Sequence, residues 1–172
     1  KEQINFLSET IDDFRDFFNP NKQKVVFEIK SAIEKSLKFM GNQFEINRVK
    51  VNIEYKDEKV YGIEIELEQV ILNILNNSMD AFKERERENK EINIKVLSKQ
   101  FYTILIMEDN AGGVKEESLE KIFDPYYTTK STGTGLYMVK LVIKNSLQGD
   151  LKINNSEKGL RYIIALPQKE EN

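Results

Sequence analysis

The apolar periodicity of this chain changes once within residues 64–107, and that change constrains its fold more than any other feature. Apolar residues recur at helical spacing through residues 64–88, which predicts one long helix. The stripe consists of Leu67, Ile71, Ile74, Leu75 and Phe82. Residues 92–97 and 101–107 then predict a hairpin of strands. The second strand is apolar on both faces and is therefore expected at the centre of a sheet.

The remaining segments alternate between helix and strand patterns in an α+β manner. We expect helices at 29–40 and 136–147, and strands at 49–55, 151–154 and 160–166. Residues 110–134 show few regular signals and predict a long irregular loop near the edge of the sheet. Together these segments predict a two-layer α/β sandwich, in which helices cover one face of a mixed, mostly antiparallel sheet.

Residues 1–20 are expected to form a long helix ahead of the domain 21–172. Apolar residues three or four positions apart mark the seam of a packed or coiled helix, and Pro20 ends it. They are Ile4, Leu7, Ile11, Phe14 and Phe18. An isolated helix of this length is marginal in water, so it needs a partner. That partner is either its own domain or a helical bundle between subunits.

The composition excludes several kinds of chemistry. The chain contains neither cysteine nor histidine, so it offers no disulfide, thiolate or imidazole, and no phosphoacceptor histidine of its own. The net charge of −3 gives no general attraction to nucleic acid or to an anionic membrane. No apolar run approaches the ~20 residues that span a bilayer, and no signal peptide is visible. The expected location is cytoplasmic.

Polar residues interrupt the long helix and follow the central strand. Asn73 and Asn77 lie on one helix face with Asp80 one turn further on, although asparagine is a poor residue inside a helix. They form either a solvated face or a ligand site. Asp109 ends the central strand, where a desolvated carboxylate needs a donor. The glycines after it, at 112 and 113, indicate either a tight turn or a backbone that approaches a ligand closely.

Three segments of this chain resemble, in order and spacing, the nucleotide site of sensor histidine kinases. They are LEQVILNILNNSMDAF at 67–82, MEDNAGGV at 107–114 and FDPYYTTKSTGTGLYMVK at 123–140. The wider family includes type II topoisomerases, MutL proteins and the Hsp90 chaperones. The ending GLRYIIALP is similar to the family's closing strand, so the resemblance covers nearly the whole chain. It implies that the chain binds ATP and Mg²⁺.

The resemblance also implies a role for individual residues. The carbonyl oxygen of Asn77 would bind the magnesium ion, and Asp109 would accept a hydrogen bond from the exocyclic amine of adenine. Asn73 stands where ATP-hydrolysing relatives have a general-base glutamate, and an amide cannot accept that proton. Asn73 and Lys130 are the expected catalytic residues. The expected ATP-binding residues are Asn77, Asp80, Asp109, Ala111, Gly113, Val114, Phe123, Thr129, Lys130, Gly133, Thr134, Gly135 and Leu136.

The chain departs from the family pattern in three places. Asp80 stands where a basic residue is common, and Ala111 replaces the first glycine of D-x-G-x-G. The usual GTGLGL is two residues shorter here, because GTGL runs directly into Tyr137. The exact contacts to the phosphates therefore stay open, although a glycine-rich loop before a helix favours an anion.

The implied function is that of the catalytic domain of a sensor histidine kinase. The γ-phosphoryl of ATP would pass to a histidine on a helix expected before Lys1, and then to the receiver domain of a response regulator. Residues 1–20 would be the second helix of the dimerisation module, so the full-length protein, which can be membrane-anchored, would be a homodimer. Two alternatives stay open: a GHKL-type ATPase, for which Asn73 is poor, and a nucleotide-sensing module without catalysis.

Overall fold

A computed structural model of the chain describes residues 23–124 and 135–170. Within these residues, the main sheet has the strand order β2-β4-β5-β7-β6. Its strands are β2 (Val49–Glu54), β4 (Lys90–Lys99), β5 (Tyr102–Asp109), β6 (Asp150–Asn155) and β7 (Leu160–Pro167). β2 runs parallel to β4, and the other neighbouring strands are antiparallel. The predicted sheet is confirmed, and β5 lies at its centre as its two apolar faces predicted.

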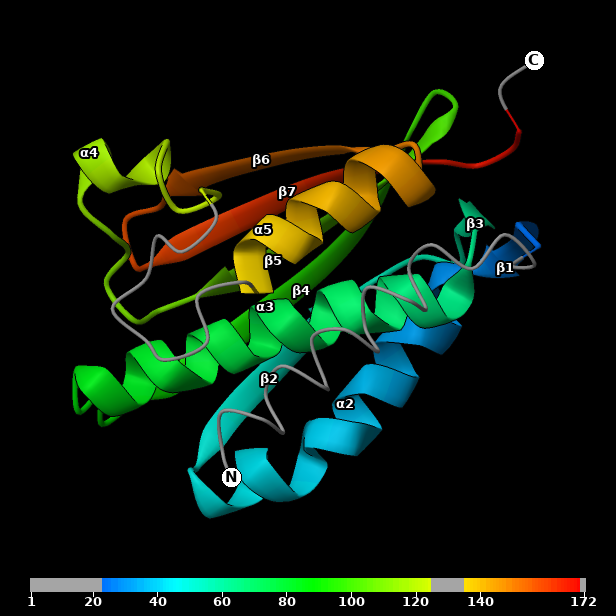
Figure 1. Cartoon of the computed structure of the whole chain (residues 1–172). Coiled ribbons are helices and arrows are strands. Elements are labelled where there is room, and N and C mark those ends of the chain that lie inside the picture. Colours follow the sequence, from blue (N-terminus) through cyan, green and yellow to red (C-terminus); the bar gives the residue numbers. More distant parts are fainter. Residues whose placement is uncertain (1–22, 125–134, 171–172) are drawn as a thin grey trace, which may run out of the picture.

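The larger helices lie on one face of this sheet (Figure 1). They are α2 (Ile29–Ile46), α3 (Glu64–Glu84) and α5 (Gly135–Leu141), which continues as the π-helical turn η1 (Val142–Ser146). On β5, the residues that point towards the helices, such as Leu105 and Met107, are buried. The predicted two-layer sandwich is therefore confirmed. None of the helices in the described ranges is long and apolar enough to cross a membrane.

The sequence did not predict a second, small sheet. Its strands, β1 (Val25–Glu28) and β3 (Lys59–Gly62), pair in antiparallel fashion. The Thr103 hydroxyl donates to the Lys59 carbonyl at 2.7 Å and so joins this sheet to β5. Four-residue strands are too short to show a clear periodicity, and their pairing depends on residues far apart in the chain.

Several predicted boundaries were wrong. α2 continues past residue 40 to Ile46 despite the glycine at 41, because the later Phe44 is buried. α3 ends at Glu84 rather than near residue 88. Residues 85–88 are all charged and so offer no apolar side chain to the core, and Glu86 takes a left-handed φ of 48°, which breaks the helix. A short helix, α4 (Glu116–Leu119), lies in the segment that was expected to be irregular.

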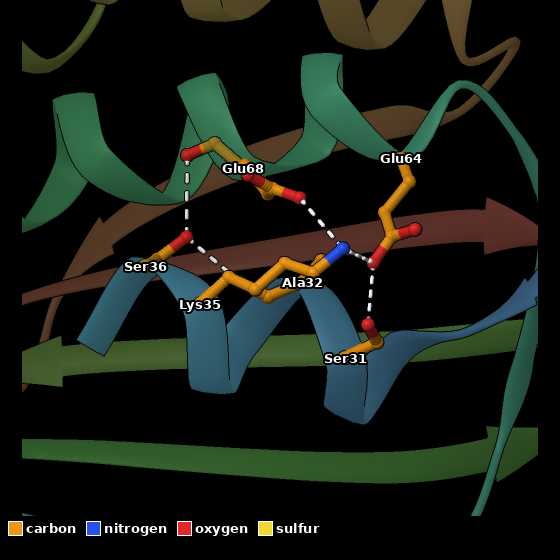
Figure 2. A network of polar contacts seen from close by, with 6 residues as sticks. All are labelled: Ser31, Ala32, Lys35, Ser36, Glu64 and Glu68. Atoms are coloured by element: carbon orange, nitrogen blue, oxygen red, sulfur yellow. Dashed lines mark hydrogen bonds and ion pairs between the residues drawn. The ribbon is translucent and has the colours of Figure 1, made fainter. Parts of the chain in front are cut away.

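A polar network joins the start of α3 to α2 (Figure 2). The Lys35 ammonium lies 2.8 Å from Glu64 Oε1 and 3.5 Å from Glu68 Oε1. The Ser31 hydroxyl donates to the same Glu64 oxygen at 2.5 Å. These contacts fix the first turns of α3, the helix that carries Asn73 and Asn77.

Candidate functional site

The Asp109 carboxylate is buried at the end of β5, with a relative exposure of 4%. Its Oδ1 accepts the backbone N–H groups of Ala111 at 2.9 Å and of Leu160 at 3.4 Å. Its Oδ2 accepts the Ser78 hydroxyl of α3 at 3.0 Å. These donors offset the cost of burying the carboxylate, so the protein itself supplies the donors that the sequence led us to expect from a ligand.

Asp109 retains the capacity for one further hydrogen bond. A carboxylate offers about four lone-pair positions. Two on Oδ1 and one on Oδ2 are taken by described residues. Among the residues that the structure describes, none takes the second acceptor position on Oδ2, which suits a single N–H of a ligand.

Close backbone packing surrounds the loop after Asp109. A Cβ on Gly113 would lie 2.3 Å from Asn155 Oδ1, and the φ of this glycine is +70°. Asn155 in turn accepts the Val114 N–H at 2.9 Å and donates to the Val114 carbonyl at 2.7 Å. A Cβ on Gly159 would lie 2.1 Å from the Asp109 carbonyl oxygen. Gly113 is thus needed for its fit against Asn155, in addition to any approach to a base.

Arg85 connects the end of α3 to the same loop. Its guanidinium donates from Nη1 to the carbonyl of Ala111 and from Nη2 to that of Gly113, the latter at 2.5 Å. A planar guanidinium can make two such bonds at fixed spacing. The side chain of Ala111 itself is fully buried, so Ala111 contributes to the site through its backbone.

The predicted polar face of α3 meets the start of α5. A Cβ on Gly135 would lie 3.4 Å from Asn73 Oδ1, so the backbone of α5 begins beside this asparagine. The Asn73 Nδ2 donates to the Gln69 carbonyl at 3.0 Å, which leaves its oxygen on the side of Gly135. Asp80 is exposed on α3. The structure therefore brings Asn73 and Gly135, two of the expected site residues, close together.

Asn77 and Asp109 both lie close to Tyr162 of β7. Its Nδ2 is buried and makes no hydrogen bond of good geometry with any described residue. Burial, and then the negative charge of Asp109, raise the pKa of the Tyr162 phenol far above its usual range, while the Asn77 side chain acts in the opposite direction. Asn77 is therefore close to the Tyr162 hydroxyl without a well-formed bond to it. Tyr162 itself is buried, with a relative exposure of 1%.

The remaining predicted site residues are only partly described. Phe123 is half-buried, and the Lys140 ammonium of α5 lies 5.2 Å from the centre of its ring. Leu136 packs against the core. The predictions for Thr129, Lys130, Gly133, Thr134 and the helix at 1–20 fall outside the described residues.

The site fits a nucleotide with its metal better than a metal alone. In the described ranges, no group of three or more Asp and Glu side chains could hold an ion. Asn77 offers one amide oxygen, and Mg²⁺ bound to a nucleotide needs few protein ligands, because phosphates and water supply the rest. The half-buried Asn77, one residue before Ser78, thus fits the predicted role.

Sequence reasoning missed residues that shape the site. Ser78 could have been found, because it interrupts the apolar stripe of α3 at a position between Leu75 and Phe82. Asn155 and Arg85 gave no such signal, because each acts on a loop that is distant in the sequence.

The chain is similar to known kinases. Sporulation kinase E of Bacillus subtilis is 28% identical over 155 residues, which are 86% of this chain and 21% of that protein. This chain therefore spans about a fifth of that relative's length. The catalytic domain of histidine kinase ThkA has a TM-score of 0.77 at 23% identity, over 85% of this chain and 96% of that one.

A second structure contains histidine kinase ThkA in complex with response regulator protein TrrA. It matches with a TM-score of 0.76 at 21% identity, over 96% of this chain and 49% of that one. The family model described as "Histidine kinase-, DNA gyrase B-, and HSP90-like ATPase" matches residues 62–170, which hold α3, Asp109 and α5. The predicted resemblance is confirmed: the chain belongs to the family of histidine kinase-, DNA gyrase B- and HSP90-like ATPases.

Proposed function

We propose that this chain is the ATP-binding kinase domain of a two-component sensor histidine kinase. The γ-phosphoryl of ATP passes to a histidine on the dimerisation module, and from there to the receiver domain of a response regulator. Residues 1–20 belong to the dimerisation module and 21–172 to the catalytic domain of a homodimeric, cytoplasmic kinase region. We expect no contact of this chain with nucleic acid or with a membrane.

The buried Asp109 carboxylate carries this proposal. Three protein donors orient it, and its one remaining acceptor position suits the amine of adenine. The same edge of guanine presents a carbonyl oxygen, which would meet this acceptor unfavourably. The arrangement therefore supports an adenine nucleotide as the ligand.

The residues of α3 supply the phosphate side of the site. The Asn77 amide oxygen is the protein ligand for magnesium, which neutralises phosphate charge when it is bound. Asn73 beside Gly135 carries an amide and no carboxylate, so it cannot take a proton from water. By the family resemblance, Lys130 and the backbone of Gly133 and Gly135 contact the phosphates. The site then holds ATP until a histidine arrives.

The proposal is tested by supplying the missing acceptor. The chain is mixed with Mg²⁺, ATP labelled in the γ-phosphate, and a separately produced dimerisation module from the same full-length protein. We expect acid-labile phosphate on the histidine of that module, and none when the module carries His→Gln at this position. Steady release of phosphate without labelling would favour an ATPase. Nucleotide binding without either reaction would favour a nucleotide-sensing module.

A further inference from the structure

Ser78 occupies an unusual position for a hydroxyl group. It lies on the buried stripe of α3 directly after Asn77, and its relative exposure is 3%. A buried serine in a helix commonly donates to a carbonyl of its own helix one turn earlier. Ser36 in α2 does this, because its hydroxyl donates to the Ala32 carbonyl at 2.8 Å, with a longer contact of 3.4 Å to the Glu68 carbonyl of α3. The Ser78 hydroxyl instead donates across the site to Asp109 Oδ2 at 3.0 Å.

This hydrogen bond fixes the plane of the Asp109 carboxylate. Oδ1 is held by the backbone N–H groups of Ala111 and Leu160. Oδ2 has only Ser78 as a partner among the described residues. Without the hydroxyl, the carboxylate could turn about its two Oδ1 contacts, and Oδ2 would lose its defined direction. Ser78 therefore determines where the remaining acceptor position of Asp109 points.

We propose that Ser78 is a positioning residue that sets the preference of this site for a 6-aminopurine. It acts through Asp109, and it aims the free lone pair of Oδ2 at the amine of the base. The inference rests on the proposed nucleotide binding, and it adds a residue that the motif pattern did not include. It also places the purine-reading function on α3, one residue after the proposed magnesium ligand Asn77.

Two ligands isolate the contact to the amine. ADP carries the 6-amino group, whereas purine riboside 5′-diphosphate has hydrogen at this position and is otherwise the same. Both dissociation constants are measured by calorimetric titration with Mg²⁺. The constant of purine riboside 5′-diphosphate divided by that of ADP reports on the amine contact alone, and this ratio falls when the contact is weakened. A variant that only loosened the fold would weaken both ligands equally and leave the ratio unchanged.

We expect Ser78→Ala to weaken ADP binding about tenfold, because a hydrogen bond to a charged group loses its alignment. Binding of purine riboside 5′-diphosphate should change less than about twofold, so the ratio should fall by nearly the same factor as ADP affinity. Ser78→Cys keeps a weaker donor of similar shape and should give an intermediate ratio. Ser36→Ala is the matched control, since it removes a buried hydroxyl far from Asp109 and should leave the ratio at the wild-type value.

An unchanged ratio in both Ser78 variants would overturn the inference while leaving the proposed function intact. The same conclusion follows if Ser36→Ala lowers the ratio as much as Ser78→Ala does. A wild-type protein that binds the two ligands equally would overturn the proposed adenine recognition and the role of Ser78 together. The wild-type measurement thus separates a failure of the proposed function from a failure of this inference.

Discussion

Gly159 shows how tightly single residues are constrained around Asp109. A Cβ at this position would lie 2.1 Å from the Asp109 carbonyl oxygen and 2.6 Å from its Oδ1. The contact is with backbone, which cannot move aside as the end of a flexible side chain can. The carboxylate and the turn between β6 and β7 therefore depend on each other.

We predict that Gly159→Ala destabilises the fold by about 1–3 kcal/mol, because the added methyl group displaces the backbone of Asp109. ADP affinity should fall as well. Gly41→Ala is the matched control: apart from the adjoining backbone of α2, no atom of the described residues lies within 4 Å of its added Cβ. That change should stabilise the helix by about 0.5–1 kcal/mol. Urea unfolding measures both effects, and equal stability of the two variants would contradict the packing argument.

Asp109 itself can be tested with an isosteric change. Asp109→Asn keeps the shape but replaces one carboxylate oxygen with a donor that would face the amine of adenine. Losing a charged hydrogen bond costs roughly 2–4 kcal/mol, so ADP affinity should fall about 30- to 1000-fold. Calorimetric titration measures this change. Wild-type affinity in a folded variant would show that the base binds elsewhere.

At the scale of elements, α3 is held at both ends while its middle carries the site. Near its start, Lys35 and Ser31 of α2 bind Glu64 (Figure 2). After its end, Arg85 binds the loop that follows β5. These contacts set where the polar face of α3 lies relative to Asp109.

The contact at the start of α3 predicts a pH dependence. Hydrogen bonds from Lys35 and Ser31 hold the pKa of the Glu64 carboxyl below its ordinary value of 4.5. The ionised group therefore stabilises the fold above about pH 4.5, and this contribution is lost as the pH falls further through the lower pKa of the folded state. Glu64→Gln should lower the free energy of unfolding at neutral pH.

The difference between Glu64→Gln and the wild type should shrink as the pH is lowered from about 5 to about 3. Denaturant unfolding at several pH values measures this trend. Glu45→Gln changes an exposed glutamate of α2 and serves as the control. A difference that stays constant over this range would mean that the Lys35 and Ser31 contacts do not stabilise the ionised carboxylate.

The contact at the end of α3 predicts that Arg85 supports ADP binding by holding the loop after β5 in place. Arg85→Lys retains the charge but cannot make two hydrogen bonds at fixed spacing, so the Ala111 and Gly113 carbonyls should be held less firmly. We expect ADP affinity to fall about threefold to tenfold, the effect of losing one modest hydrogen bond. Arg48→Lys, a change at an exposed arginine just after α2, is the control and should leave ADP affinity unchanged. Calorimetric titration compares the two variants.

At the scale of the whole molecule, a two-layer fold places the site where α3, α5 and the end of β5 meet (Figure 1). The sheet orients Asp109 and Tyr162, and α3 presents Asn73 and Asn77. The chain contributes no histidine, so it provides a nucleotide site but no phosphoacceptor. Catalysis by such a site depends on positioning ATP against a partner.

We predict that the chain alone, with Mg²⁺ and ATP, neither labels itself on histidine nor hydrolyses ATP appreciably. It has no histidine, and the position expected for a general base is held by Asn73. Phosphate release and acid-labile labelling measure the two outcomes. Sustained turnover by the wild type that is abolished by Asn77→Ala would show that the chain is an ATPase and would contradict the kinase proposal.

The sequence by itself determined the fold class, the central place of β5 and the helix α3. Each of these depends on periodicity within one segment, which local backbone geometry fixes. It also pointed to Asn73, Asn77 and Asp109, because amides inside a helix and a carboxylate after a buried strand conflict with local preferences.

Only the tertiary structure decided how these residues are held. The pairing of β1 with β3, the donation from Ser78 to Asp109, and the packing of Gly159 against Asp109 join residues that are distant in the sequence. Periodicity shows which face of an element is buried, but it does not show which residue of another element that face will meet. The carboxylate was thus predictable from its strand, whereas its donors depended on how α3 and β7 pack around it.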